Sequence, residues 1–221
     1  MKICIIIPTY NESKEIFRLV KEVKEQNPDV LVVDDGSRDN TAQIASDAGA
    51  VVLRNQVNAG KGACLRKGFA YALTHDFEAV ITMDGDGQHL PQDLQYFICL
   101  AGLSQSDILI GNRMLQTQNM PLIRIITNKF MSWLISCLCK QDIPDTQCGF
   151  RLIKTHVLKK ITLETAKYEI ETEILLKAAR GGFKIESVPI TTVYRGQKSQ
   201  INPFLDTLRF LKFIIKAGCG K

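Results

Sequence analysis

The chain has 221 residues, of which 45% are hydrophobic and 23% charged, and its formal net charge is +5. This composition excludes a disordered chain and supplies one sizeable hydrophobic core, so we expect a single domain over residues 1–221. The small positive excess is compatible with phosphate ligands or an anionic membrane surface, and we expect no nucleic-acid partner.

Cysteine usage and the length of the apolar runs limit the cellular setting. The seven cysteines are odd in number and include no Cys-x-x-Cys spacing, so neither a disulfide framework nor a zinc site is expected. A reducing, cytoplasmic setting fits this pattern. No run of about 20 apolar residues occurs, so we expect no membrane span, and the short run after Met1 lacks the features of a secretion signal.

Short apolar runs alternate with helical patterns through the first half of the chain. Strands are predicted at 3–7, 30–33, 50–53, 79–83 and 107–111. Helices are predicted between them, from Ile16 to Pro28 and at 41–48, 58–72 and 91–103. This alternation predicts an α/β fold with a mostly parallel, Rossmann-like sheet and helices on both of its faces.

Polar residues follow four of these predicted strands. They are Pro8 to Glu12, Asp34-Asp35, Asp84 to Gln88, and Asn112-Arg113. In sheets of this type, ligands bind outside the carboxyl ends of the strands. The shared edge is therefore where we expect a nucleotide pocket.

The second half of the chain has a different pattern. Residues 120–140 predict a helix with a wide apolar face, which is either a core helix or a helix in a membrane interface, where Trp133 would be favoured. Further predictions are a helix at 169–180, a strand at 184–194 that Pro189 places at an edge or bulge, a basic loop at 195–199 and an amphipathic terminal helix at 204–216.

The acidic stretch after the fourth predicted strand has the chemistry of a metal site. Asp84 and Asp86 place two carboxylates one residue apart, Gln88 adds a neutral oxygen, and Gly85 lets the backbone turn sharply. Such an all-oxygen set suits Mg²⁺ or Mn²⁺ and leaves coordination sites for phosphate oxygens. The alternative is an acidic turn that caps the next helix.

Seven motifs occur together in a fixed order. They are Pro8-Thr9-Tyr10-Asn11-Glu12, Asp34-Asp35-Gly36-Ser37, Asn58-x-Gly60-Lys61-Gly62, Asp84-Gly-Asp86-Gly-Gln88, Gly111-Asn112-Arg113, Asp145 to Arg151, and Arg195-x-x-Lys198. From residue 3 to about 215 the chain resembles the family 2 glycosyltransferases of the GT-A fold. Within them it is similar to the polyprenyl-phosphate branch, with its dolichyl-phosphate mannose synthases and dolichyl-phosphate glucosyltransferases. The resemblance implies a nucleotide-sugar-binding half at 1–115 and an acceptor-binding half at 116–221 with amphipathic interface helices.

The resemblance also implies roles for individual residues. The nucleotide-sugar site would be lined by Pro8, Tyr10, Glu12, Asp35, Lys61, Asp84, Asp86 and Gln88. Mg²⁺ or Mn²⁺ on the donor diphosphate would be held by Asp84, Asp86 and Gln88. The acceptor phosphate would be bound by Arg113, Arg195 and Lys198, which with Asp86 form the catalytic set. For Lys61 a solvated surface charge stays open as the alternative.

The acceptor determines the proton chemistry. A sugar hydroxyl needs a general base, whereas a lipid phosphate is already anionic near neutral pH. We therefore expect no dedicated base, and the resemblance implies that the transfer is inverting. The nearest alternative is a family 2 enzyme that acts on a sugar or polysaccharide hydroxyl, with Asp145 as its base. A non-catalytic sugar-nucleotide sensor and a nucleotidyltransferase are further alternatives, which the intact Asp84–Gln88 stretch and the lack of a Gly-rich first loop disfavour.

The expected partners are a GDP- or UDP-hexose donor, with mannose and glucose both open, and a polyprenyl phosphate. The protein is expected on the cytoplasmic face of a membrane, bound peripherally through the 120–140 segment and the terminal helix. Many relatives carry carboxy-terminal membrane spans and this chain is expected to have none, which leaves room for a separate membrane-protein partner.

Overall fold

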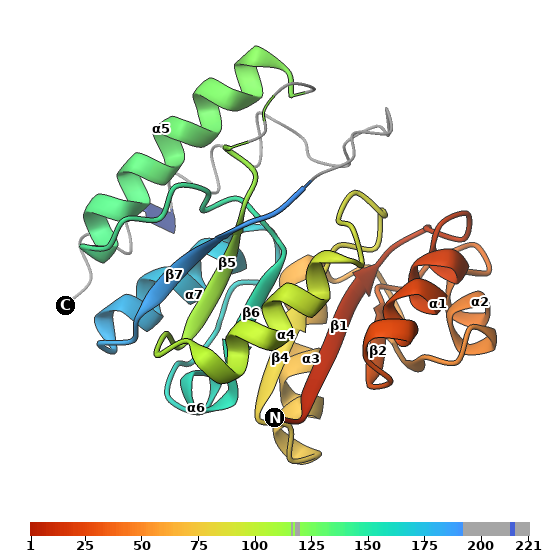
Figure 1. Cartoon of the computed structure of the whole chain (residues 1–221). Helices are drawn as coiled ribbons and strands as arrows, with labels where there is room; N and C mark the ends of the chain where they lie inside the picture. Colours follow the sequence, from red (N-terminus) through yellow and green to blue (C-terminus); the bar gives the residue numbers. More distant parts are fainter. Residues whose placement is uncertain (116, 118–119, 192–212, 215–221) are drawn as a thin grey trace.

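A seven-stranded sheet forms the centre of the computed structural model, which describes residues 1–115, 117, 120–191 and 213–214 (Figure 1). The strand order is β3-β2-β1-β4-β6-β5-β7. The strands are β1 (Ile3–Thr9), β2 (Val30–Asp34), β3 (Val51–Arg54), β4 (Ala79–Thr82), β5 (Ile108–Asn112), β6 (Arg151–Lys154) and β7 (Ile185–Pro189). All run parallel except β6, which lies antiparallel between β4 and β5.

Helices cover both faces of this sheet, as Figure 1 shows. The helices are α1 (Ile16–Gln26), α2 (Thr41–Asp47), α3 (Lys61–Thr74), α4 (Asp93–Leu103), α5 (Leu122–Cys139), α6 (Thr155–Leu158) and α7 (Glu169–Arg180). One face carries α1 with α2 and α4, and the other carries α3 with α7. Because both faces are covered, the central strands are apolar on both sides, and the residues from Ile3 to Ile7 are all buried. The predicted α/β class is confirmed.

Helix α1 has the organisation that its sequence predicts. Its buried side chains are Ile16, Leu19, Val20 and Val23, which follow the i, i+3, i+4, i+7 pattern of a helix with one apolar face. The helix ends at Gln26, two residues before Pro28, whose ring cannot continue a helix.

The antiparallel placement of strand β6 is the main feature of the sheet that local sequence patterns do not predict. The strand begins at Arg151, the last residue of the motif that starts at Asp145, and it pairs antiparallel with both β4 and β5. Thr82 and Arg151 are partners in the register, so the 145–150 loop arrives at the carboxyl end of β4. Hydrophobic periodicity cannot reveal this placement because it carries no information on which strands pair. The short helix α6 is also unpredicted.

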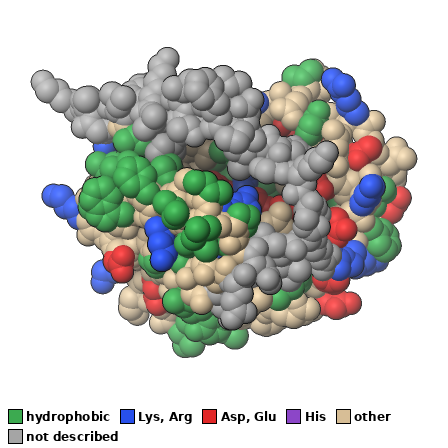
Figure 2. All heavy atoms as spheres, turned by 90° about the horizontal axis from the view of Figure 1, so that it is seen from above, with side chains coloured by type: hydrophobic (Ala, Val, Ile, Leu, Met, Phe, Trp, Pro, Cys, Tyr) green, Lys and Arg blue, Asp and Glu red, His purple; other side chains and the backbone are tan. Residues whose placement is uncertain are grey.

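Helix α5 is organised in the opposite way to α1. The side chains it turns toward the domain are Asn128, Ser132, Ile135 and Cys139, and it packs along α7. Large apolar side chains are exposed on its outer surface, and they are Leu122, Ile123, Ile126, Phe130, Trp133 and Leu138. In Figure 2, which looks down on the top of Figure 1, hydrophobic side chains gather over this helix. The interpretation of 120–140 as a core helix is therefore wrong.

By length and composition alone, α5 is also apolar enough to cross a membrane, which the sequence analysis did not expect. Its polar inner face and its packing on α7 place it on the surface of the domain. Strand β7 closes the described sheet as an edge strand, as Pro189 predicted. The predicted terminal helix lies outside the described residues, apart from the helical residues Phe213 and Ile214.

Candidate functional site

The candidate site lies where the parallel strands end. The carboxyl ends of β1, β2, β4 and β5 share one edge of the sheet, and the antiparallel β6 brings the 145–150 loop to the same edge. Figure 1 shows α5 at this end of the molecule, the end toward which β1 runs. The polar residues that follow four predicted strands thus meet at one edge, as the alternation of strands and helices predicted.

Asp84 is paired with a lysine that comes from a distant part of the chain. The Lys61 ammonium lies 2.5 Å from Asp84 Oδ1 and 2.6 Å from Glu171 Oε1. Lys61 begins α3 and Glu171 lies in the first turn of α7, so the ion pair joins both halves of the chain. Burial alone would raise the pKa of Asp84, but the charge of Lys61 outweighs it and holds that pKa low. Lys61 is therefore no solvated surface charge.

Asp86 lies close to Asp84, and its carboxylate is bound by a backbone group instead of a charged side chain. Its carboxylate accepts a hydrogen bond from the backbone N–H of Gln88 at 3.0 Å. Burial, and after it the charge of Asp84, raises the pKa of Asp86. Burial and then the charge of Asp86 likewise raise the pKa of Glu12, to about 7. The site thus concentrates more negative charge than Lys61 can balance.

These residues fit a small divalent ion. Among the described residues no cluster of three or more His, Cys, Asp or Glu side chains could hold a metal ion. Mg²⁺ and Mn²⁺ do not need such a cluster, because one or two carboxylates and the phosphates of a substrate complete their coordination. Asp84, Asp86 and the Gln88 amide would supply the protein oxygens, and the excess of negative charge favours a cation there.

Two glycines let the backbone approach the acidic stretch closely. A Cβ atom on Gly149 would lie 2.6 Å from Asp84 Oδ2 and 2.9 Å from Lys61 Nζ. A Cβ on Gly85 would lie 2.7 Å from Thr9 Cγ2. All three distances are shorter than the contacts that real Cβ atoms make. Any other residue at either position would therefore displace the groups around Asp84. The hydroxyl of Thr82 donates to the Gly149 carbonyl at 2.7 Å and holds this approach in place.

His89 completes the predicted stretch as a buried, apolar-facing ring. Its ring packs edge-on against Phe150, with 5.4 Å between the centroids. Nδ1 accepts a hydrogen bond from the Asp84 backbone N–H at 3.4 Å, and burial lowers the pKa of His89 to about 4. The ring is therefore neutral near pH 7 and acts as packing beneath the acidic stretch.

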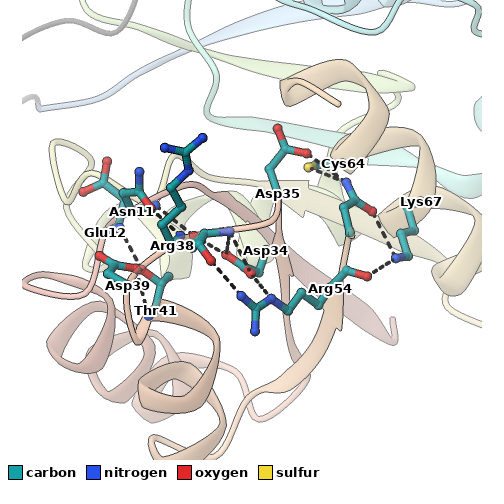
Figure 3. Close-up of polar contacts among 12 residues, drawn as sticks. Asn11, Glu12, Asp34, Asp35, Arg38, Asp39, Thr41, Arg54, Cys64 and Lys67 are labelled. Carbon is teal, nitrogen blue, oxygen red and sulfur yellow. Dashed lines mark hydrogen bonds and ion pairs between the residues drawn. The ribbon is translucent and has the colours of Figure 1, made fainter. Parts of the chain in front are cut away.

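The carboxylate of Asp34, at the end of β2, is saturated by the protein itself (Figure 3). Asp34 is fully buried, accepts hydrogen bonds from the backbone N–H and the hydroxyl of Ser37, and pairs with Arg54 Nε at 3.0 Å. Its role is to close the turn after the strand and to attach β3 to it.

Asp35 binds the segment that precedes α3. Its carboxylate accepts hydrogen bonds from Asn55 Nδ2 at 2.9 Å, from the Ala59 N–H at 2.8 Å and from the Gly60 N–H at 2.7 Å. The carboxylate offers about four lone-pair positions, so the three N–H donors leave one, and the weakly donating thiol of Cys64 lies beside it. The predicted contact with a nucleobase N–H stays a prediction that this geometry allows.

Asp145 and Arg113 form a bidentate ion pair. Arg113 donates from Nε to Asp145 Oδ2 at 2.7 Å and from Nη2 to Oδ1 at 2.9 Å, and its backbone N–H adds a bond of 3.0 Å to Oδ2. Asp145 has an exposed fraction of 0%. The pair links the end of β5 to the 145–150 loop.

Arg151 fixes the same loop from within the core. Its guanidinium donates to the backbone carbonyls of Cys148, Thr146 and Glu171. Its hydrogen-bond partners among the described residues are all carbonyls, so this fully buried arginine has a structural role and ties the loop to the start of α7.

The structure places most of the predicted site residues at this edge. Pro8 is the second-last residue of β1, and Tyr10 and Glu12 follow that strand. The Glu12 N–H donates a hydrogen bond to Thr41 Oγ1 at 2.9 Å. Arg195 and Lys198 lie outside the described residues, so their assignment stays a prediction.

Two residues of the candidate site, Glu171 and Gly149, were not singled out from the sequence. Glu171 has a visible signal: in the 169–180 helix it lies four positions before Leu175 on the buried face, and a carboxylate facing a core implies a cationic partner. Which lysine it meets is not visible, because Lys61 is 110 positions away. Gly149 has no local signal, since its need for space arises from Asp84.

Comparison with known proteins places this geometry in context. A model of glycosyl transferase family 2 matches residues 4–162. The polyprenol monophosphomannose synthase of Mycolicibacterium smegmatis is 31% identical over 205 residues, which are 86% of this chain and 77% of that protein. The UDP-N-acetylglucosamine–dolichyl-phosphate N-acetylglucosaminyltransferase of Methanococcus voltae is 29% identical over 215 residues, 87% of this chain and 86% of that protein.

The fold also matches solved structures. Glucosyl-3-phosphoglycerate synthase of Mycobacterium tuberculosis, in complex with Mn²⁺, UDP-glucose and phosphoglyceric acid, has a TM-score of 0.77 at 16% identity. The match covers 100% of this chain and 81% of that one. At this identity the likeness concerns the fold, and it confirms the GT-A architecture expected from the sequence.

Proposed function

The chain belongs to glycosyl transferase family 2, and from that premise we propose that it transfers a hexose from a nucleotide sugar to a polyprenyl phosphate at the cytoplasmic face of a membrane. That it is a glycosyltransferase follows from the family. The acceptor, the donor and the membrane are the proposed parts. Two relatives whose names give a polyprenol or dolichyl phosphate product or acceptor support the choice of lipid.

The observation that carries the proposal is the state of Asp145. An enzyme that glycosylates a hydroxyl needs a base within hydrogen-bond reach of it. Asp145, the candidate for that role, is fully buried and engaged by Arg113 through two side-chain bonds and one backbone bond. Freeing it would break a charge-assisted pair, whereas an anionic phosphate needs no base.

The donor site is proposed at the ends of β1, β2 and β4. Asp84, Asp86 and Gln88 would hold Mg²⁺ or Mn²⁺, and Lys61 would lie beside the diphosphate. When bound, the divalent ion neutralises charge that develops on the leaving nucleoside diphosphate. Pro8, Tyr10, Glu12 and Asp35 would surround the nucleoside, and Arg113, Arg195 and Lys198 would orient the acceptor phosphate.

The outer surface of α5 supports the membrane location. Its exposed leucine, isoleucine and aromatic side chains lie at the end of the molecule that carries the site. Arg124 and Lys129 lie on the same helix and suit an anionic surface. A lipid acceptor could then reach the site without leaving the interface.

The test of the acceptor compares a short polyprenyl phosphate with the corresponding polyprenol, using a panel of GDP- and UDP-sugars. We expect transfer to the phosphate only, with one donor preferred. Asp145→Asn should keep transfer to the phosphate within about tenfold of the parent, since no proton is removed. Equal transfer to the alcohol would favour the hydroxyl-directed enzyme instead, with Asp145 as its candidate base.

The membrane part is tested by flotation with vesicles of anionic lipid. Trp133→Glu places a charge on the outer surface of α5, where the tryptophan is 62% exposed, and should reduce bound protein about tenfold or more. Phe17→Glu is the matched control, because Phe17 is 48% exposed on α1, and it should leave binding unchanged. Equal binding of both variants would show that α5 does not contact the lipid.

A further inference from the structure

One lysine connects the two halves of the candidate site. Lys61 Nζ lies within 2.6 Å of a carboxylate oxygen on each side, Asp84 from the donor half and Glu171 from the acceptor half. The three side chains are between 10% and 30% exposed. Charges shielded from water interact more strongly than they would at the surface, so both contacts carry weight.

Glu171 is held in a fixed position. It lies in the first turn of α7, and its backbone carbonyl accepts a hydrogen bond from Arg151 Nη1. Arg151 also binds the loop carbonyls of Thr146 and Cys148, so the backbone at Glu171 is tied to the loop beneath the site. The carboxylate is therefore a fixed second partner for Lys61, separate from the predicted metal ligands.

Lys61 and a divalent ion compete for the same carboxylate. A bound Mg²⁺ would lie about 2.1 Å from a ligand oxygen, and Asp84 Oδ1 already has the ammonium at 2.5 Å. The Oδ2 side is closely approached by the backbone at Gly149, where a Cβ would lie only 2.6 Å away. Two cations on one carboxylate repel each other, so the ammonium has to weaken its contact when the ion binds.

We propose that Glu171 is a positioning residue that shares Lys61 with Asp84 and retains the ammonium when a divalent ion occupies Asp84. The inference rests on the proposed function, which supplies the ion and the diphosphate. Lys61 then opposes metal binding to the protein alone. When a nucleoside diphosphate is present, the same ammonium faces its phosphates and supports binding. Metal binding is in this way coupled to donor binding through one side chain.

The test measures Mn²⁺ binding without nucleotide, from the EPR signal of free Mn²⁺. Lys61→Met should bind Mn²⁺ about tenfold tighter, because a direct competitor worth about 1.4 kcal/mol is gone. Glu171→Gln should bind it several-fold weaker, because Lys61 then belongs to Asp84 alone. Lys167→Met is the matched control for charge, since its side chain packs against Gly60, and should change binding less than twofold.

The double variant Lys61→Met/Glu171→Gln shows whether Glu171 acts through Lys61. We expect it to bind Mn²⁺ like Lys61→Met, so the effect of the glutamate disappears when the lysine is absent. With UDP or GDP added, Lys61→Met should instead weaken formation of the ternary complex. If Lys61→Met does not fold, as its thermal melt would show, Lys61→Gln takes its place.

Two results would overturn the inference. One is unchanged or weaker Mn²⁺ binding by the folded Lys61 variant. The other is that Glu171→Gln changes Mn²⁺ affinity equally with and without Lys61, which would mean that the charge of Glu171 acts on the ion directly and not through the lysine. Asp86→Ala separates this failure from failure of the proposed function. If Asp86→Ala binds Mn²⁺ like the parent, the metal site itself is rejected. If Asp86→Ala loses Mn²⁺ binding but the Lys61 variant binds like the parent, only the inference is rejected.

Discussion

Two acidic pairs stand at the carboxyl ends of β2 and β4, the strands on either side of β1. Asp34 and Asp35 accept hydrogen bonds from six protein donors, on residues 37, 54, 55, 59 and 60. From the described residues, Asp84 and Asp86 have two donors, the Lys61 ammonium and the Gln88 N–H. A carboxylate saturated by its own protein stabilises the fold, and one with spare oxygens is available to a ligand.

This difference explains how similar sequence patterns can serve different purposes. In both cases aspartates follow a buried apolar strand and precede a glycine. Asp34 closes a turn and Asp35 binds the segment before α3, so most acceptor positions of the first pair are occupied by the protein itself. The second retains unbalanced negative charge at the edge where ligands bind in such sheets. The number of protein donors thus distinguishes a structural carboxylate from one that can still bind a ligand.

The largest expected effect follows from removing an unsaturated carboxylate. Asp86→Ala should lower kcat at least about 10³-fold, about 4 kcal/mol of barrier, because the ion that stabilises the leaving group is lost. The melting temperature should stay within a few degrees, since among the described residues only the Gln88 N–H donates a hydrogen bond to the Asp86 carboxylate. Turnover is measured at buffered Mg²⁺ and unfolding by circular dichroism. Parent-like turnover would show that the second pair is structural as well.

A control for that variant uses the metal itself. Saturating Mn²⁺ should raise the free energy of unfolding of the parent, by about 2.7 kcal/mol at a hundred times its Kd. Asp86→Ala should show no such increase. An equal increase in both proteins would place the ion elsewhere.

An intermediate effect is expected from removing Asp34, the saturated carboxylate, and it should appear in the free energy of unfolding instead of in kcat. Asp34→Ala should lower the free energy of unfolding by about 2–3 kcal/mol, because the Ser37 N–H is left without its acceptor and Arg54 without its counter-charge. Urea unfolding measures this loss. At a temperature where the variant is folded, kcat should fall less than about tenfold. If Asp34→Ala kept the full stability of the parent but had strongly reduced turnover, Asp34 would not be a structural carboxylate.

The sequence predicts the sheet well and the site in part. Strong alternation of apolar runs and helical patterns identified β1, β2, β4 and α1, because burial on both faces leaves a clear signal in the residues themselves. The antiparallel β6 and the partners of Asp84 depend on contacts between distant segments, which no local pattern records. Motif order indicated that Asp34, Asp35, Asp84 and Asp86 gather at one edge, but only the structure shows which of them are satisfied.

Helix α5 also shows what local sequence patterns leave undecided. Composition left two interpretations of 120–140 open, since an apolar helix suits a core and a membrane surface alike. The choice depends on which side the domain covers, and α5 turns Asn128 and Ser132 inward and Trp133 outward. Ser132 Oγ accepts the Thr146 N–H at 2.9 Å, a contact that no hydropathy value could anticipate.

The smallest expected effect concerns Asp35, which lies between the two classes. Three donors leave its carboxylate one acceptor position, so a nucleobase N–H can still bind. Asp35→Ala should weaken nucleoside diphosphate binding about tenfold and change kcat at saturating donor less, because such a contact is equal in ground and transition states. Calorimetry gives the Kd, and steady-state kinetics gives kcat and KM.

Loss of the segment contacts could weaken binding without any base contact, so the test of Asp35 needs a second variant. Asn55→Ala removes one donor to Asp35 and leaves the carboxylate in place, and it should keep nucleotide affinity within about twofold. A nucleoside diphosphate methylated at the base N–H completes the design: the parent should bind it about tenfold more weakly, and Asp35→Ala should not distinguish it from the unmodified nucleotide. The contrary result is that Asn55→Ala weakens binding as much as Asp35→Ala does and that the parent binds the methylated analogue normally. Asp35 would then be a purely structural carboxylate like Asp34, and other groups would recognise the nucleobase.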